Sequence, residues 1–150
     1  EQKLEEKLEQ KLEQKLEEKL EQKLEQKLDE KLEQKLKDKG TLDFTDMLGL
    51  MVAQFQNRRD IVYKEINAID GLSCVKPRGA FYAFVNIRGT GLSSEEFATR
   101  LLTEKHVGLV PGTGFGASGE GFVRISYATS TENLREGIRR IGEFVKELKK

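Results

Sequence analysis

The sequence of 150 residues predicts an α+β protein, in which a long N-terminal helix precedes a small α/β sandwich of helix, two strands, helix, two strands and helix. Three observations lead to this fold class. Residues 1–40 repeat a four-residue unit of strong helix formers, and three later segments carry apolar residues at helical spacing. Short stretches of alternating polarity, bounded by glycine or proline, separate those segments. We therefore expect two regions, a low-complexity helical repeat over residues 1–40 and a small domain over residues 41–150.

The repeat has the form E-(Q/E)-K-L, with a leucine at every fourth position from Leu4 to Leu36. A period of four drifts by about 40° per repeat relative to the helix turn, so the leucine row spirals around the helix. Like charges also stack at i,i+4, as Glu1 and Glu5 illustrate. Two interpretations stand open, a coiled-coil or partner-binding arm and a solvated helical extension without specific packing. The period favours the second, because it fits no stable supercoil.

The small domain is expected to begin with a helix from Asp43 to about Ile69, followed by an Asp-Gly stop signal. Its apolar residues at helical spacing are Leu48, Val52, Phe55, Val62, Ile66 and Ile69. Two strands are predicted next, over residues 73–76 and 80–87, and the turn between them contains Pro77.

A second helix is predicted to open at Ser93, because S-S-E-E has the form of a capping box. Its expected buried stripe is Phe97, Ala98, Leu101 and Leu102. Strands over residues 107–110 and 121–128 flank a glycine-rich loop, and Thr129–Glu132 caps the last helix. The apolar face of that helix is expected to be Leu134, Ile138, Ile141, Val145 and Leu148.

Composition excludes several classes of function. The 26 basic and 26 acidic residues cancel, and no basic block suggests a nucleic-acid partner. No apolar run approaches the roughly 20 residues of a membrane span, and no charged-then-apolar leader is present. The single cysteine, Cys74, cannot form an intrachain disulfide, so a reducing, cytoplasmic compartment is expected. We expect this thiol to be half-buried and inert, and we expect no metal site.

The loop contains G-F-G-A-S-G, a match to the dinucleotide fingerprint at Gly114, Gly116 and Gly119. That fingerprint needs a helix after the loop, so that the pyrophosphate meets a helix N-terminus. Here the following G-F-V-R-I-S-Y-A alternates like a strand. We therefore reject dinucleotide binding and expect these glycines to supply turns and close backbone approach.

Arg124 is the most informative side chain of this strand. It shares one face with Phe122 and Ser126, and a mid-strand arginine between apolar residues must reach an anion or solvent. Its planar fork suits a bidentate carboxylate or phosphate. The competing interpretation is an outer-face arginine or a structural ion pair with a residue such as Glu120. Sequence physics alone places this second interpretation slightly ahead.

Three motifs then become recognisable in order: P-x-G-A-F-Y at Pro77–Tyr82, V-P-G-x-x-F-G at Val110–Gly116 and V-R-I-S-Y-A at Val123–Ala128. Together they resemble the C-terminal small domain of class I, fold-type I pyridoxal-phosphate-dependent aminotransferases, the aspartate-aminotransferase-like group. The resemblance covers roughly residues 47–148.

The resemblance implies roles for individual residues. Arg124 matches the arginine that binds the substrate's α-carboxylate, and Phe115 would lie near the substrate side chain in a loop that borders the pocket. Gly79 would let the hairpin backbone turn tightly. His106, at a helix end, is expected to have a capping or solvent role. The implied ligand is the carboxylate of an amino acid or 2-oxo acid.

The departures from the family are equally informative. The lysine that forms the Schiff base with pyridoxal phosphate, and the other cofactor-binding motifs, belong to a large domain and do not occur in this sequence. We therefore expect no catalytic residue, no bound cofactor and no activity for this chain by itself, which looks like a small domain separated from its enzyme.

Two alternatives stay open: a non-catalytic scaffold or interaction protein with a long helix, and a small anion-binding module. Self-association through the exposed face of the small domain or through the repeat helix is a further expectation.

Overall fold

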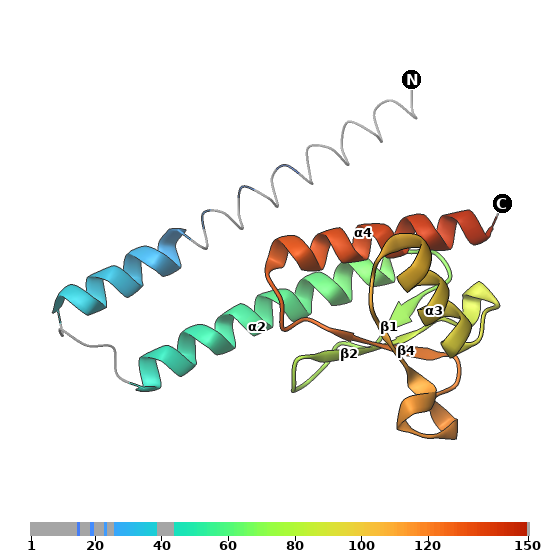
Figure 1. Ribbon diagram of the computed structural model, residues 1–150. Helices are drawn as coiled ribbons and strands as arrows, with labels where there is room; N and C mark the ends of the chain where they lie inside the picture. Colours follow the sequence, from blue (N-terminus) through green and yellow to red (C-terminus); the bar gives the residue numbers. More distant parts are fainter. Residues whose placement is uncertain (1–14, 16–18, 20–22, 24–25, 39–43, 150) are drawn as a thin grey trace. The chain divides into compact units, whose positions relative to one another are not determined.

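The computed structural model describes residues 15, 19, 23, 26–38 and 44–149. Residues 26–38 are helical, as expected for this part of the repeat, and the rest of the repeat lies largely outside the described residues. The chain divides into two compact units, Glu1–Met51 and Val52–Lys150. In the first unit, Lys35 forms an ion pair with Asp46. The second unit contains the sheet and the candidate site, and it is described below by itself (Figure 1).

The element order of the small domain follows the predicted alternation of helices and strands. Helix α2 spans Phe44–Asn67, strands β1 and β2 span Ser73–Cys74 and Tyr82–Asn86, and helix α3 spans Ser94–Lys105. Strand β3 is Val110–Pro111, the short 3-10 turns η2 and η3 are Gly112–Phe115 and Ala117–Gly119, strand β4 is Phe122–Ser126, and helix α4 is Thr131–Leu148. A further 3-10 turn, η1, covers Arg88–Thr90. The α+β fold class is confirmed.

The four strands form one antiparallel sheet in the order β1-β2-β4-β3. Five residue pairs join β2 to β4, and Phe84 lies opposite Arg124 in this register. Val110 of β3 lies opposite Arg124 on its other side. Arg124 is therefore in a central strand, with a neighbouring strand on each side.

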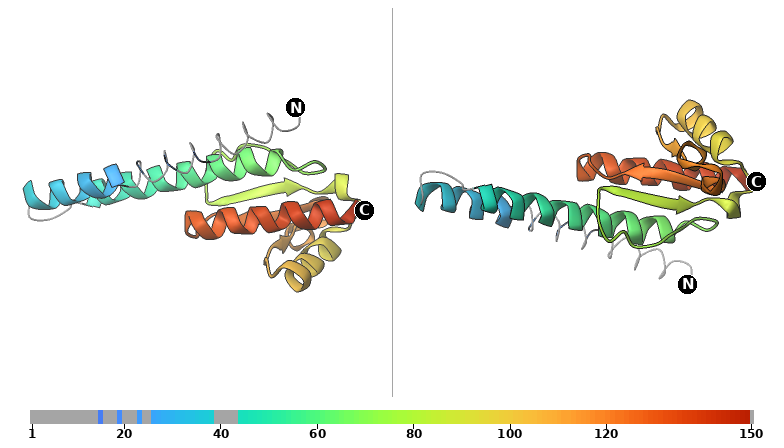
Figure 2. Two further views of the ribbon diagram at one scale, coloured as in Figure 1. Left: turned by 90° about the horizontal axis from the view of Figure 1, so that it is seen from above. Right: turned by 90° about the horizontal axis from the view of Figure 1, so that it is seen from below.

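Helices α2 and α4 run side by side on one face of the sheet, as the views from above and from below in Figure 2 also show. An ion pair of 2.9 Å between Glu65 and Arg135 joins them. Helix α3 packs on α4 through an edge contact between Phe97 and Phe144, whose ring centroids are 5.3 Å apart. The helices thus cover one side of the sheet.

Both predicted N-terminal caps are present. The hydroxyl of Ser93 accepts a hydrogen bond from the backbone N–H of Glu96 at the start of α3. The hydroxyl of Ser130 accepts one from the N–H of Asn133 at the start of α4. Each bond satisfies a backbone donor that a helix leaves free in its first turn.

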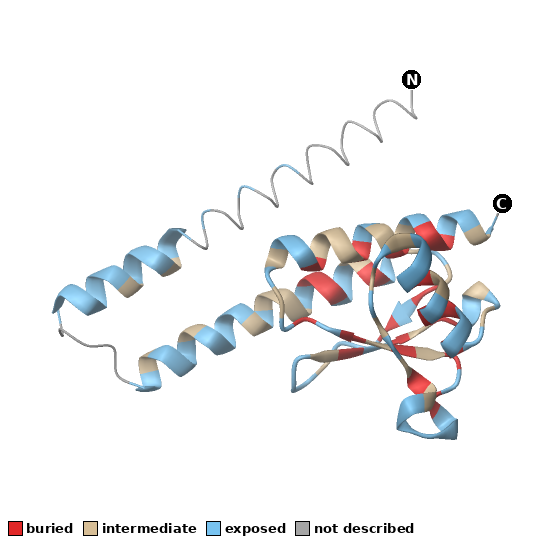
Figure 3. Ribbon diagram, viewed as in Figure 1, coloured by how far each residue is buried: buried red, intermediate tan, exposed pale blue. Residues whose placement is uncertain are grey.

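The core lies between the helices and the covered face of the sheet (Figure 3). Among its fully buried side chains are Val62 and Ile66 of α2, Phe97 and Leu101 of α3, Phe144 of α4, and Val85, Val123 and Tyr127 from the sheet side. Alternation in β4 produces this division, because Val123 and Ile125 face the core while Phe122, Arg124 and Ser126 face the other way.

Some element boundaries differ from those predicted. The first strand ends at Cys74 instead of residue 76, close to Pro77, which has no N–H to donate to a ladder. The expected strand over residues 107–110 is Val110–Pro111, because residues 107–109 pair with no described strand. Leu102 was wrongly placed in the buried stripe of α3. Its side chain is 54% exposed on the outer side of the helix.

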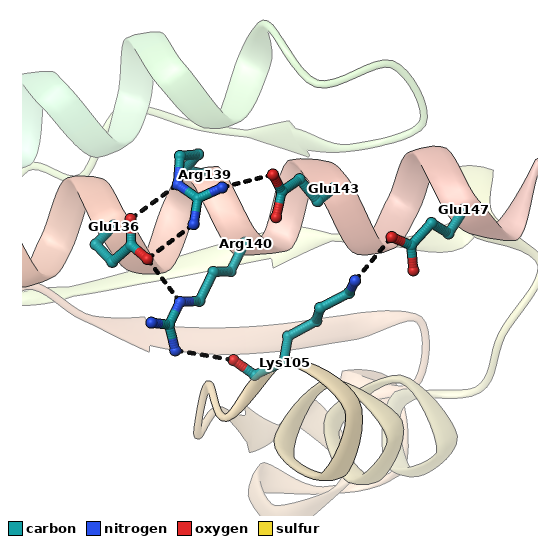
Figure 4. A network of polar contacts seen from close by, with 6 residues as sticks. All are labelled: Lys105, Glu136, Arg139, Arg140, Glu143 and Glu147. Carbon is teal, nitrogen blue, oxygen red and sulfur yellow. Dashed lines mark hydrogen bonds and ion pairs between the residues drawn. The ribbon is translucent and has the colours of Figure 1, made fainter.

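A network of charged side chains holds the C-terminal end of α3 against α4 (Figure 4). Arg140 pairs with Glu136 at 2.8 Å and donates a second hydrogen bond, of 3.1 Å, to the backbone carbonyl of Lys105. Lys105 in turn pairs with Glu147 at 2.8 Å. The carbonyl is in the last turn of α3, where no backbone N–H of a following turn is available to donate to it. Arg140 therefore serves as a side-chain cap.

Candidate functional site

One face of the sheet carries no helix in the second unit, and we call it the open face. Strand β2 contributes Tyr82, Phe84 and Asn86 to it, and β4 contributes Phe122, Arg124 and Ser126. The turns η2 and η3 extend on the side of the sheet away from α4 (Figure 1). Phe84 and Phe115 are 41% and 51% exposed, so aromatic surface is accessible beside the arginine.

The guanidinium group of Arg124 lies between two aromatic rings. Its Cζ is 4.1 Å from the ring centroid of Tyr82 and 4.8 Å from that of Phe115. Phe115 also makes an edge contact with Phe84, at 5.5 Å between centroids. Stacking of this kind stabilises a cation by about 0.5–2 kcal/mol, and it fixes the plane of the fork. The rings thus restrain the orientation of the arginine.

No carboxylate pairs with Arg124 among the described residues, and its buried Nε makes no hydrogen bond there. The ion pair with Glu120 that the sequence suggested is absent, because Glu120 is used elsewhere. Its Oε1 accepts a hydrogen bond of 2.9 Å from the backbone N–H of Ser94. Arg124 therefore carries a positive charge that no carboxylate of the described chain neutralises, and it donates no hydrogen bond to a carbonyl there.

The glycine-rich loop is a strand-to-strand connection, as predicted, and it folds into the two 3-10 turns. A Cβ atom built on Gly119 would lie 2.0 Å from the carbonyl oxygen of Gly112, and one built on Gly112 would lie 2.1 Å from that of Gly119. Gly116 has a φ of 118°, which L residues avoid. Gly112 and Gly119 thus lie in backbone contact at the base of the loop, which we call its neck. Gly116 turns the backbone at the tip of the loop, next to Phe115.

The structure corrects the expectation for Gly79. A Cβ at this position would meet nothing within 4 Å, and Gly79 has no positive φ. The left-handed residue of the hairpin is Ala80, with a φ of 58°. The hydroxyl of Tyr127 donates a hydrogen bond of 2.9 Å to the carbonyl of Ala80, which ties the turn to the core.

Two other singled-out residues lie away from the open face. His106 ends α3 in a left-handed conformation and its N–H donates to the carbonyls of Leu101 and Leu102, in agreement with the expected position at a helix end. Cys74 is free and buried, and burial raises the pKa of its thiol. A buried thiol with a raised pKa is poorly reactive at neutral pH.

A groove of about 340 Å³ lies between α2 and the connection from β1 to β2. Val52, Phe55, Phe81 and Tyr127 are among the residues that line it. Tyr127 faces the covered side of the sheet, whereas Arg124 faces the open side. Arg124 is not among the residues that line the groove.

Sequence reasoning missed two residues of this region. Tyr82 stacks on Arg124 and is two residues before Phe84 on the same face, so strand alternation offered a signal for it. Ser94 is the one polar residue in the buried set of the described chain, at 0% exposure, although the sequence placed it only in a helix cap. No local signal distinguishes Ser94 from Ser93, because burial depends on the loop that packs on it.

Comparison with known proteins assigns the family. The family model of class I and II aminotransferases matches residues 29–141. This chain belongs to that family. An aromatic-amino-acid aminotransferase of Thermococcus litoralis is 48% identical over 99 residues, which are 66% of this chain and 25% of the relative. An aspartate aminotransferase of Pyrococcus abyssi is 48% identical over 99 residues, again 66% of this chain and 25% of the relative.

Solved structures agree with the fold. The crystal structure of an aromatic aminotransferase from Pyrococcus horikoshii matches with a TM-score of 0.66 and 44% identity, over 71% of this chain and 29% of that one. An alanine aminotransferase from Pyrococcus furiosus matches with a TM-score of 0.65 and 38% identity, over 68% and 26% of the two chains. The chain thus spans about a quarter of the length of its relatives, in agreement with a small domain of this pyridoxal-phosphate-dependent family.

The residues around Arg124 do not by themselves fit pyridoxal phosphate. The cofactor needs an amine for its Schiff base, and the residues that β2 and β4 place on the open face include no lysine. Three described lysines, Lys76, Lys105 and Lys149, pair with carboxylates away from this face.

No group of three or more His, Cys, Asp or Glu side chains is arranged to hold a metal ion among the described residues. Nor does any described helix combine the length and apolar character that crossing a membrane requires.

Proposed function

We propose that residues 41–150 form the small domain of an aminotransferase and that Arg124 binds the α-carboxylate of the amino acid or 2-oxo acid. The observation that carries this proposal is the guanidinium group of Arg124, which is stacked between Tyr82 and Phe115 and has no carboxylate partner among the described residues. A planar, oriented fork binds a carboxylate through two parallel hydrogen bonds.

The open face supplies binding and orientation. The stacked rings hold the guanidinium plane in place, so less conformational freedom is lost when a carboxylate binds. Phe115 and Phe84 border the arginine and would contact the side chain of the bound acid. In the family, pyridoxal phosphate carries the amino group between substrates. Arg124 would hold the acid by its carboxylate and thereby fix the position of its Cα.

The relatives differ in the substrates that their names state, which are aromatic amino acids, aspartate and alanine. A shared carboxylate-binding arginine is compatible with all three, because every α-amino acid carries the α-carboxylate. Specificity for the side chain would arise from other residues. The proposal for this chain therefore concerns the carboxylate alone.

The test is a titration of the whole chain with phenylpyruvate, followed by NMR or calorimetry, and with its methyl ester as the neutral control. Substitution Arg124→Leu should abolish binding of the acid. Arg88→Leu is the matched control, since Arg88 also stacks on a sheet aromatic, with its Cζ 4.9 Å from the ring of Phe122. Equal weakening by both substitutions would indicate unspecific attraction, and a native chain that binds no acid at millimolar concentration would contradict the proposal.

We also propose that the chain is inactive by itself. After incubation with pyridoxal phosphate and reduction with borohydride, mass spectrometry should find no pyridoxyl group fixed on one specific lysine. A single lysine labelled stoichiometrically would overturn this part of the proposal.

A further inference from the structure

Ser94 occupies an unusual position for a serine. It is the first residue of α3, its side chain is 0% exposed, and it lies where the helix meets the end of the glycine-rich loop. Burial of a hydroxyl costs free energy unless it makes hydrogen bonds, so a fully buried serine is expected to have specific hydrogen-bond partners.

Four hydrogen bonds join Ser94 to residues 119–122, which end the glycine-rich loop and begin β4. Its Oγ accepts from the backbone N–H of Gly121 at 2.8 Å and from that of Phe122 at 3.2 Å. The same hydroxyl donates to the carbonyl of Gly119 at 3.4 Å. The backbone N–H of Ser94 donates to the carboxylate of Glu120 at 2.9 Å. One residue thus satisfies polar groups of four consecutive residues, 119 to 122.

Residues 119–122 adjoin both the loop that carries Phe115 and the strand that carries Arg124. Gly119 is in backbone contact with Gly112, so residues 112 and 119 close the neck of the loop that carries Phe115. Phe122 begins β4, and Arg124 follows two residues later on the same face. A shift of the neck would move the ring of Phe115 relative to the guanidinium of Arg124, which it now meets at 4.8 Å.

We infer that Ser94 is a positioning residue of the carboxylate site: its hydroxyl fixes the neck of the glycine-rich loop and thereby sets the stacking of Phe115 on Arg124. The inference rests on the proposed function for its effect on carboxylate binding, whereas its effect on the stacking can be measured without any ligand. Those four hydrogen bonds of Ser94 go to residues 119–122 and not to Arg124, so Ser94 acts through the loop.

The test compares Ser94→Ala with Ser93→Ala in the full chain. Ser93 is the adjacent residue and its hydroxyl caps the same helix by accepting from Glu96 at 3.2 Å, but no hydrogen bond joins its side chain to the loop among the described residues. Both substitutions remove hydrogen bonds at the start of α3 and should lower stability. Only Ser94→Ala should change the ring-current shifts of the Arg124 side-chain protons, and only it should weaken phenylpyruvate binding, by about tenfold.

A milder pair of variants keeps the inference testable if Ser94→Ala does not fold. Glu120 is exposed, and Glu120→Ala removes one bond of the set, whereas Glu120→Gln retains a carbonyl acceptor. Glu120→Ala should shift the Arg124 resonances in the same direction as Ser94→Ala, and Glu120→Gln should restore them.

Each outcome has a distinct meaning. Unchanged Arg124 resonances in both Ser94→Ala and Glu120→Ala would overturn the positioning role. Equal changes in Ser94→Ala and Ser93→Ala would also overturn it, because the effect would then belong to the helix cap. If the native chain binds no carboxylate but Ser94→Ala alone alters the Arg124 resonances, the positioning role stands and the proposed function fails.

Discussion

The two faces of β4 differ in character, although its five residues simply alternate between them. Val123 and Ile125 on the covered face are 1% and 5% exposed and pack beneath the helices. On the open face, Arg124 is held by two aromatic rings and by no carboxylate of the described chain. Burial of apolar area stabilises the covered face, whereas the open face carries a partly exposed guanidinium group with no carboxylate partner in the described chain.

The difference shows that one strand can place core packing on one face and a partly exposed cation on the other. Alternation of side chains places every second residue in a different environment, so substitutions on one face need not disturb the other. The glycine-rich loop connects the two roles, because its neck is fixed near α3 while its tip reaches the open face. Four predictions sharpen this contrast, from the largest expected effect to the smallest.

Truncation in the core should be the most damaging change. Phe144→Ala should lower the free energy of unfolding by about 3–5 kcal/mol, since a fully buried ring leaves a cavity. Phe84→Ala is the matched control on the open face, where the ring is 41% exposed, and it should cost about 1 kcal/mol or less. Urea unfolding followed by circular dichroism measures both, and similar losses would break the contrast between the faces.

Glycines of the same motif should respond differently to an added methyl group. Gly119→Ala should destabilise by about 1–3 kcal/mol, because the new Cβ would lie 2.0 Å from a backbone oxygen. Gly114→Ala should be nearly neutral, since its nearest neighbour is a side-chain atom of Val110 at 3.9 Å. Thermal unfolding of both variants tests this, and a tolerated Gly119→Ala would show that the neck can open.

The hairpin should gain stability from a change at Ala80. Ala80→Gly should raise the free energy of unfolding by up to about 1 kcal/mol, because a φ of 58° costs an L residue energy that glycine does not pay. The gain is limited by the greater freedom of glycine in the unfolded chain. Gly79→Ala, with open space around its Cβ, is the comparison, and a loss of stability in Ala80→Gly would contradict the expected strain.

Because of the charged network on α4, the free energy of unfolding should fall as the pH is lowered into the acid range. Hydrogen bonds from Arg139 and then Arg140 lower the pKa of Glu136 from 4.5 to about 2. A carboxyl group with a lowered pKa in the folded state contributes stability above its unfolded value, and loses it as the pH falls from about 4.5 to about 2. The effect should be small, because the group is exposed and screened.

Urea midpoints measured across this pH range give the test. Glu136→Gln should flatten the pH dependence, and Glu132→Gln, in the first turn of the same helix, should change it less. The same slope in the native chain and in Glu136→Gln would show that the network adds nothing to the folded state.

Much of the architecture could be predicted from local sequence patterns. Spacing of the apolar residues in α4, the serine caps of α3 and α4 and the alternation in β4 were all predicted, because each depends on residues close in sequence. The strand boundaries were less accurate, since a strand ends where its partner ends. The exposure of Leu102 could not be read either, because it depends on which side of α3 the sheet and α4 occupy.

The sequence by itself determined the fold class and singled out Arg124, because a charge in an apolar strand is a local feature, whereas Phe115 was named only through the resemblance to the aminotransferase family. Only the tertiary structure decided what surrounds them. It brought Tyr82 from β2 and Phe115 from η2 onto one guanidinium, and it directed Glu120 to Ser94 instead of to Arg124. Strand pairing and packing select such partners, and the pairing of Glu120 with Ser94 spans 26 residues, a separation that no local pattern encodes.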